Sequence, residues 1–193
     1  MNSICVFCGS HAGNDQAYAA AAREISGLIA ARGGTLVYGG GSVGLMGVAA
    51  DEAMARGARV IGVIPRTLWE REVGHRGITE NRVVETMHER KALMYDLADG
   101  FVALPGAVGT LDEFFETWTW AQLGVHAKPF GILNVAGYFD ALLTFLNHVV
   151  ESGFMRRDYL EMVLVDADAR QLLKRMDEFV PPQIPKWATR QSV

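Results

Sequence analysis

Short apolar runs alternate with longer amphipathic segments along most of the chain. Each short run is bounded by glycine, proline or polar residues, which is typical of buried β-strands. The predicted strands are Ile4–Phe7, Thr35–Tyr38, Arg59–Ile64, Val83–Glu85, Gly100–Leu104, Pro129–Asn134 and Val163–Val165. Apolar residues three and four positions apart in the longer segments predict helices. These run from a cap at Asn14 or Asp15 to Ala31, and over Gly44–Arg56, Met87–Ala98, Thr110–Leu123, Tyr138–Glu151 and Ala167–Phe179.

Strands that alternate with helices predict an α/β fold. Parallel strands require crossover connections, which are right-handed and place helices on both faces of the sheet. We therefore expect a doubly wound, Rossmann-like parallel sheet in a single domain. The polar residues 66–81 are expected to form a loop with at most one short helix. The predicted domain covers residues 1–180, and residues 181–193 form a proline-containing tail.

The composition of the chain excludes several classes of protein. The 193 residues suit one domain, and 50% hydrophobic with 21% charged residues excludes a disordered chain. The net charge of −4 gives no general basic surface for nucleic acid. No apolar run approaches the roughly 20 residues of a membrane span, and the first residues lack the basic region of a signal peptide. We therefore expect a cytoplasmic protein without a membrane or nucleic-acid partner.

Cys5 and Cys8 form a C-x-x-C pair. Redox motifs of this kind place the first cysteine at a helix N-terminus, whereas both of these lie on or just after a predicted strand. A structural or incidental role is therefore favoured for both cysteines.

Glycine is overrepresented, with 21 residues, and it clusters after predicted strands, where open α/β sheets bind ligands. Gly39, Gly41 and Gly44 satisfy G-x-G-x-x-G. A dinucleotide site would also need an acid after the next strand, where Arg66 stands instead, and this loop follows the second strand rather than the first. The loop, including Gly41 and Ser42, is predicted to face a nucleotide. Tight helix packing is the alternative.

A second glycine loop follows a buried strand and opens a helix. The first turn of a helix has unpaired N–H groups and the positive end of the dipole, which favour an anion. No lysine follows the last glycine, so the loop is not a Walker motif and suits a monophosphate. The Glu113 carboxylate would repel that anion, so its place beside the loop indicates another task, such as activating water or binding ribose hydroxyls. The candidate phosphate-binding residues are Gly106, Ala107, Gly109 and Thr110.

Arg90 and Lys91 lie near the start of a predicted helix, where two cations oppose the helix dipole. Because this placement costs stability, the pair is expected to have a function, such as neutralising a phosphate or polarising a leaving group. A solvated basic pair is the alternative.

The two motifs together, Met87-x-x-Arg90-Lys91 and Pro105-Gly106-Ala107-Val108-Gly109-Thr110-x-x-Glu113, resemble the paired signature of the LOG (Lonely guy) family. Its members are cytokinin riboside 5′-monophosphate phosphoribohydrolases, often labelled lysine decarboxylase-like. The resemblance covers roughly residues 3–165 and includes Cys8–Ser10, Tyr38–Gly47, Thr119–Gly124 and Asn134–Tyr138.

The resemblance implies that Arg90 and Glu113 are the catalytic pair. It also implies a homodimer with active sites near the subunit interface. The substrate-binding residues that it implies are Glu72, Lys91, Gly106, Ala107, Gly109, Thr110 and Thr119. The chain departs from the family pattern at Ala107, where glycine is usual. Alanine keeps its N–H, and it would be strained by about 1 kcal/mol or more only at a positive φ.

The implied reaction hydrolyses the N-glycosidic bond of (N6-modified) adenosine 5′-monophosphates and releases free base, cytokinin or adenine, with ribose 5-phosphate. Its transition state resembles an oxocarbenium ion. Glu113 is expected to stabilise that cation and align a water. Arg90 stays protonated, and so it is expected to orient the nucleotide or stabilise charge. The alternative is a non-catalytic nucleotide-binding or carrier protein on the same fold.

We expect neither a metal nor a cofactor. The five histidines form no metal-binding pattern. A pyridoxal-phosphate decarboxylase needs a Schiff-base lysine, and among four lysines only Lys91 is a plausible candidate. Decarboxylation is therefore disfavoured.

Overall fold

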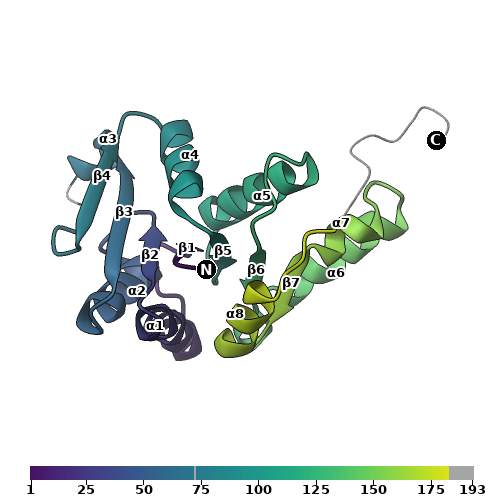
Figure 1. Ribbon diagram of the computed structural model, residues 1–193, viewed down its shortest axis with the longest axis horizontal. Coiled ribbons are helices and arrows are strands. Elements are labelled where there is room, and N and C mark those ends of the chain that lie inside the picture. Colours follow the sequence, from purple (N-terminus) through teal and green to yellow (C-terminus); the bar gives the residue numbers. More distant parts are fainter. Residues whose placement is uncertain (72, 183–193) are drawn as a thin grey trace.

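The computed structural model describes residues 1–71 and 73–182, and within them seven strands form one parallel sheet (Figure 1). The strand order is β4-β3-β2-β1-β5-β6-β7, so the order reverses between β1 and β5. All six strand pairs are parallel. The predicted doubly wound, Rossmann-like fold is therefore confirmed. The strands are β1 (Ser3–Phe7), β2 (Thr35–Tyr38), β3 (Arg59–Pro65), β4 (Glu80–Val84), β5 (Gly100–Ala103), β6 (Phe130–Leu133) and β7 (Val163–Asp166).

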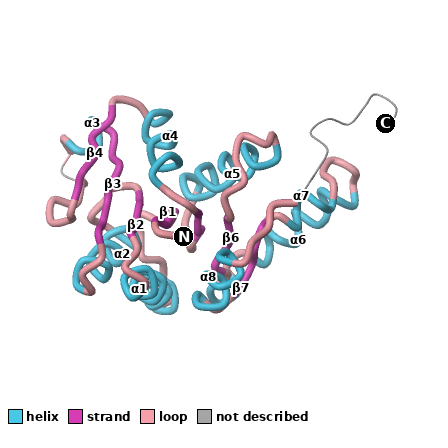
Figure 2. Tube along the Cα trace, in the orientation of Figure 1, coloured by secondary structure: helices cyan, strands magenta, loops and turns pink. Residues whose placement is uncertain are grey.

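Helices cover both faces of the sheet (Figure 2). The side chains of β1 alternate, so that Ile4 and Val6 join the core beneath α1, α2 and α8, whereas Cys5 and Phe7 join the core beneath α4, α5 and α6. The helices are α1 (Gln16–Ala31), α2 (Gly44–Ala55), α3 (Arg66–Trp69), α4 (Met87–Leu97), α5 (Val108–Gln122), α6 (Asp140–Glu151), α7 (Arg157–Glu161) and α8 (Ala169–Asp177). In the described part of the chain, no helix is long and apolar enough to cross a bilayer.

The differences from the predicted elements have local causes. The strand β4 starts at Glu80 rather than Val83, because its polar first residues pair with β3 at the sheet edge. The short helix α7 was not predicted, since five residues are too few to show a helical period. The helix α5 starts at Val108, two residues before the predicted start, and its N-cap Ala107 makes no side-chain cap hydrogen bond.

The turn after β1 ties the two glycine loops together at the carboxyl edge of the sheet. The Gly9 N–H donates to the Pro105 carbonyl at 3.0 Å, and the Leu45 N–H donates to the Gly9 carbonyl at 3.0 Å. Because β1 lies between β2 and β5, both loops face the point where the strand order reverses. Open α/β sheets bind their ligands at this point.

Candidate active site

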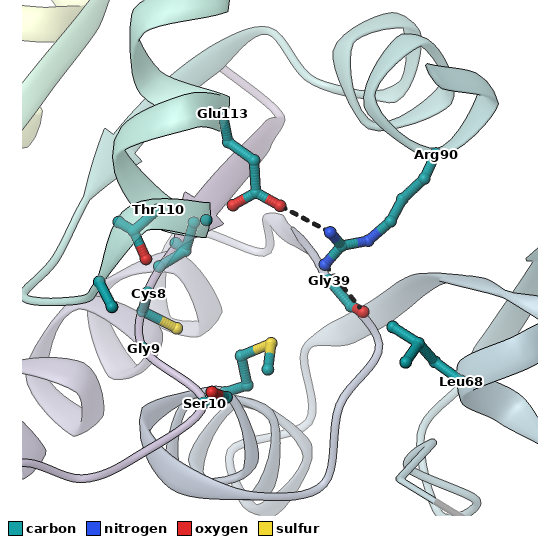
Figure 3. Close-up of a pocket in the computed structure, with 12 residues that line it drawn as sticks. Cys8, Gly9, Ser10, Gly39, Leu68, Arg90, Thr110 and Glu113 are labelled. Carbon is teal, nitrogen blue, oxygen red and sulfur yellow. Dashed lines mark hydrogen bonds and ion pairs between the residues drawn. The ribbon is translucent and has the colours of Figure 1, made fainter. Parts of the chain in front are cut away.

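A cavity of about 210 Å³ lies where the two glycine loops and α4 meet (Figure 3). Figure 3 shows the side chains of Arg90, from α4, and Glu113, from α5, pointing toward one another across it. Of the predicted site residues, the structure brings five together along its wall: Arg90, Ala107, Gly109, Thr110 and Glu113. Residues that were not predicted to belong to the site also line it, among them Ser10, Met46 and Leu68.

Arg90 and Glu113 form a buried ion pair. Arg90 Nη1 donates to Glu113 Oε1 at 2.8 Å, and the two residues are only 8% and 9% exposed. The guanidinium also donates from Nε to the Val63 carbonyl at 3.1 Å and from Nη2 to the Gly39 carbonyl at 3.2 Å. With three groups donating to three fixed acceptors, the guanidinium has one orientation. It holds the carboxylate beside the cavity rather than in solvent.

The first glycine loop makes room for this arrangement. A Cβ on Gly39 would overlap Arg90 Nη2, so the guanidinium reaches its place only because residue 39 is glycine. Gly44 has φ +61, and a Cβ there would collide with the backbone of Ser10. The predicted ligand contacts of this loop lie elsewhere. Gly41 borders a neighbouring cavity, and the Ser42 hydroxyl donates to the Val73 carbonyl at 3.2 Å.

The second glycine loop opens α5 beside the carboxylate. Thr110 is 4% exposed and lies in the first turn, where helix N–H groups have no intrahelical partner. A Cβ on Gly106 would overlap the Thr110 hydroxyl, so glycine allows that close approach. Ala107 has φ −95, so the backbone strain that a side chain would cause at a positive φ does not arise. The loop can therefore offer N–H groups and the helix dipole to an anion.

Burial sets the protonation behaviour of the site. Burial raises the pKa of the Glu113 carboxyl, and the neighbouring Arg90 guanidinium lowers it by less, so the pKa stays above its ordinary value. Cys8 borders the cavity, where burial and the Glu113 carboxylate raise the pKa of its thiol. The thiol is thus neutral and a poor nucleophile. The pKa of the buried Cys5 thiol is also raised by burial, and both cysteines are free.

Five predicted contacts among the described residues do not line this cavity: Gly41, Ser42, Lys91, Gly106 and Thr119. Lys91 forms ion pairs with Asp112 at 3.1 Å and Glu116 at 3.2 Å on α5. Thr119 lies nine residues beyond Thr110 on the same helix, about 14 Å along its axis, and is exposed. Glu72 lies outside the described residues.

A second, mostly apolar cavity of about 720 Å³ adjoins the first and shares Ser10, Met46 and Leu68 with it. Its other walls come from the turn after β1, the first glycine loop and the segment around α3: His11, Ala12, Gly41, Val43, Gly44, Ile64 and Val73. Apolar residues such as Leu68 and Val73 within the mostly polar segment 66–81 were an unused sequence signal for this cavity.

The chain is similar in sequence to a described family and to proteins of named activity. A family model described as "Possible lysine decarboxylase" matches residues 46–176. Cytokinin riboside 5′-monophosphate phosphoribohydrolase LOG1 of Arabidopsis thaliana is 47% identical over 178 residues, which cover 92% of this chain and 84% of that protein. The phosphoribohydrolase LOG of Oryza sativa subsp. japonica is also 47% identical, over 92% of this chain and 74% of that protein.

Among solved structures, similarity extends to proteins that handle another ligand. The molybdenum cofactor binding protein of Rippkaea orientalis superposes with a TM-score of 0.69 at 19% identity, over 91% of this chain and 95% of that one. The molybdenum cofactor carrier protein of Chlamydomonas reinhardtii gives a TM-score of 0.64 at 22% identity, over 89% of this chain and 98% of that one. At such low identity these matches establish the shared fold alone.

Proposed function

The chain belongs to the LOG family of cytokinin riboside 5′-monophosphate phosphoribohydrolases, and from that membership we propose that it cleaves the N-glycosidic bond of N6-modified adenosine 5′-monophosphates. The products are the free base and ribose 5-phosphate. The observation that carries the proposal is the buried Glu113 carboxylate, held by Arg90 next to the N-terminus of α5. A site that only binds phosphate has no use for a carboxylate there.

The 5′-phosphate is proposed to lie at the start of α5, against Ala107, Gly109 and Thr110. The N–H groups of the first turn and the Thr110 hydroxyl then neutralise its charge. With the phosphate fixed there, the ribose lies along the cavity toward Glu113, which borders the same 210 Å³ space.

Glu113 is proposed to stabilise the oxocarbenium-like transition state and to align the attacking water. The water oxygen bonds to C1′ as the C1′–N bond breaks, and the departing base takes up a proton. Arg90 keeps the carboxylate in place and favours its ionised form despite burial. It also supplies fixed positive charge near the leaving base and phosphate.

The apolar cavity supports a base with an apolar N6 substituent. It adjoins the proposed ribose site and is lined largely by aliphatic side chains such as Val43, Ile64 and Leu68. An isopentenyl group would bury apolar surface there that adenine lacks. We propose that both AMP and N6-isopentenyl-AMP are substrates and that the prenylated nucleotide has the higher kcat/KM.

The carrier alternative and the decarboxylase label have weaker support. The carrier proteins share the fold at 19–22% identity, whereas the phosphoribohydrolases share 47% of residues over 92% of the chain. A Schiff-base lysine needs a lowered pKa. Burial lowers the pKa of Lys91, but its hydrogen bonds to Asp112 and Glu116 prevail and raise the pKa above the ordinary value. Lys91 is therefore a poor nucleophile.

A homodimer in the cytoplasm completes the proposal. Large apolar side chains are exposed near the end of α5 and between α6 and α7, including Leu123, Val125 and Phe154. A second copy of the chain would cover such side chains, and Thr119 on the exposed side of α5 would then lie near the interface. Light scattering of the purified protein should give a mass near twice 21.1 kDa.

The direct experiment incubates the protein with AMP and with N6-isopentenyl-AMP and measures free base and ribose 5-phosphate. We expect equimolar products, with no base released from the corresponding nucleosides at comparable rates. Absence of base from every nucleoside monophosphate would instead favour the carrier. Replacement of the carboxylate in Glu113→Gln should lower kcat by about a thousandfold or more while AMP still binds. Glu24→Gln, on the exposed side of α1, is the matched control.

A further inference from the structure

Tyr138 follows β6 in a turn that is fixed on both sides. Asn134 Oδ1 accepts a hydrogen bond from the Phe139 N–H at 2.8 Å, and Asn134 Nδ2 donates to Asp140 Oδ1 at 2.7 Å. Phe139 is 2% exposed and anchors the turn in the core. The backbone at Tyr138 is therefore held at the carboxyl edge of the sheet, close to the second glycine loop.

The Tyr138 hydroxyl reaches across to that loop. Its Oη donates to the Gly106 carbonyl oxygen at 2.7 Å. The ring packs edge-on against Tyr18, with centroids 5.5 Å apart, and against Phe139, with centroids 4.9 Å apart. Because two rings clamp the phenol, the hydroxyl has little freedom to choose another acceptor. Tyr138 is nevertheless 42% exposed, so burial of its ring is an incomplete account of the residue.

This hydrogen bond sets the orientation of one peptide group. The described chain contains no cis peptide, and in a trans peptide the C=O and the following N–H point in opposite directions. Fixing the Gly106 carbonyl therefore also fixes the N–H of Ala107, a residue that lines the 210 Å³ cavity. The flanking carbonyls are anchored by backbone groups, Pro105 by the Gly9 N–H at 3.0 Å and Ala107 by the Leu111 N–H at 3.2 Å.

We propose that Tyr138 is a positioning residue for phosphate recognition: its hydroxyl turns the Gly106–Ala107 peptide so that the Ala107 N–H donates to the 5′-phosphate. The inference rests on the proposed function and adds a residue to it. Tyr138 acts through the loop and does not touch the reacting atoms. Its loss should therefore weaken binding of phosphorylated ligands and leave the chemical step almost unchanged.

The test compares Tyr138→Phe, which removes only the hydroxyl, with Tyr18→Phe, which keeps the edge-on ring pair intact. No hydrogen bond of the Tyr18 hydroxyl is present among the described residues, so the second variant is a matched control. Calorimetry measures the Kd of inorganic phosphate, of adenosine, and of AMP in a Glu113→Gln background that prevents turnover. Steady-state kinetics with N6-isopentenyl-AMP give KM and kcat.

We expect Tyr138→Phe to weaken AMP and phosphate binding and to raise KM by about three- to tenfold, the usual worth of one neutral hydrogen bond, with kcat within about twofold of the parent. Adenosine binding and the Tyr18→Phe protein should be unchanged. Equal AMP affinity in the two variants, or an equal loss for adenosine and AMP, would overturn the inference. If the parent protein releases no base, the proposed function fails, and the phosphate and AMP affinities still decide the role of Tyr138.

Discussion

The two glycine loops at the carboxyl edge of the sheet use their glycines in different ways. In the loop after β2, glycine is required by space and backbone angle: a Cβ on Gly39 would overlap Arg90, and Gly40 and Gly44 have φ +76 and +61. In the loop before α5, space requires glycine only at Gly106, where a Cβ would overlap the Thr110 hydroxyl. A Cβ on Gly109 would meet nothing within 4 Å, and residue 107 already carries a side chain.

The loop that matches the dinucleotide pattern thus serves mainly as a support. It admits the Arg90 side chain from α4 and, through Gly39, offers the carbonyl to which the guanidinium donates. The other loop has fewer glycines, yet it presents the open start of α5 to the cavity. A glycine pattern after a strand identifies a close approach of the backbone to something, and here that partner is an arginine rather than a pyrophosphate.

The largest effect is expected from Gly39→Ala in the loop after β2. The added methyl group must displace the guanidinium, and a displacement of about 1 Å at a catalytic group commonly costs about a hundredfold in rate. We expect kcat/KM for N6-isopentenyl-AMP to fall by about that factor, while the protein remains folded by circular dichroism. An activity within about threefold of the parent would contradict the supporting role of the loop.

A double-mutant cycle tests whether Gly39 acts through Arg90. If Gly39 acts through Arg90, the Gly39→Ala change should have almost no further effect in an Arg90→Ala background, where no guanidinium remains to be displaced. Arg90→Ala alone should lower kcat/KM severely, to a small residual rate in which the cycle is measured, because it leaves the buried Glu113 carboxylate unpaired. Additive effects of the two changes would show that Gly39 has a role independent of Arg90.

The next largest effect concerns pH, and it follows from the burial that the two loops create. The fold raises the pKa of Glu113, and the ionised carboxylate is the form that stabilises a cation. Activity should therefore fall on acidification with a midpoint above the ordinary carboxyl value of 4.5, because protonation neutralises the proposed catalytic group. The pH dependence of kcat measures this midpoint, and the residual activity of Glu113→Gln should lack it.

The raised pKa of Glu113 affects stability in the opposite direction, since acidification should favour the folded state. A carboxyl whose pKa is raised by folding binds its proton more tightly in the native state than in the unfolded chain. Its contribution to the free energy of unfolding is therefore greatest below the ordinary pKa and is lost as pH rises through the raised value. In Glu113→Gln, urea unfolding should lose this component of the pH dependence, whereas a parent-like pH dependence would contradict the assigned shift.

The sequence was sufficient for the sheet and for the parts of the site that local patterns encode. Buried strands such as Gly100–Ala103 are continuous apolar runs, and the loop before α5 has its glycines and Thr110 close together in the sequence. The pairing of Arg90 with Glu113 was suggested by family resemblance, and the contact depends on packing of α4 beside α5. Spacing along one chain carries no such information.

Other features could not be predicted from the sequence, because they join residues that lie far apart along the chain. The Tyr138–Gly106 hydrogen bond spans 32 positions, and the apolar cavity combines residues from the turn after β1 with residues around α3. Lys91 was expected to bind substrate, and its ion pairs with α5 depend on a side-chain direction that the sequence leaves open. Its role and that of Thr119 stay predictions.

The smallest expected effect is that of Ala107→Gly, which restores the residue usual in the family. Because Ala107 already has φ −95, glycine relieves no strain, and the peptide N–H is present in both residues. We therefore expect kcat/KM within about twofold of the parent and a loss of about 0.5–1 kcal/mol in the free energy of unfolding, because glycine increases the entropy of the unfolded chain. Kinetics with N6-isopentenyl-AMP and urea unfolding measure the two quantities. A tenfold gain in activity would mean that the methyl group obstructs the phosphate, and position 107 would then need glycine for space, as Gly39 and Gly106 do. A small change in the predicted direction would instead establish that position 107 tolerates a side chain, whereas a Cβ on Gly39 or Gly106 would overlap a neighbouring side chain.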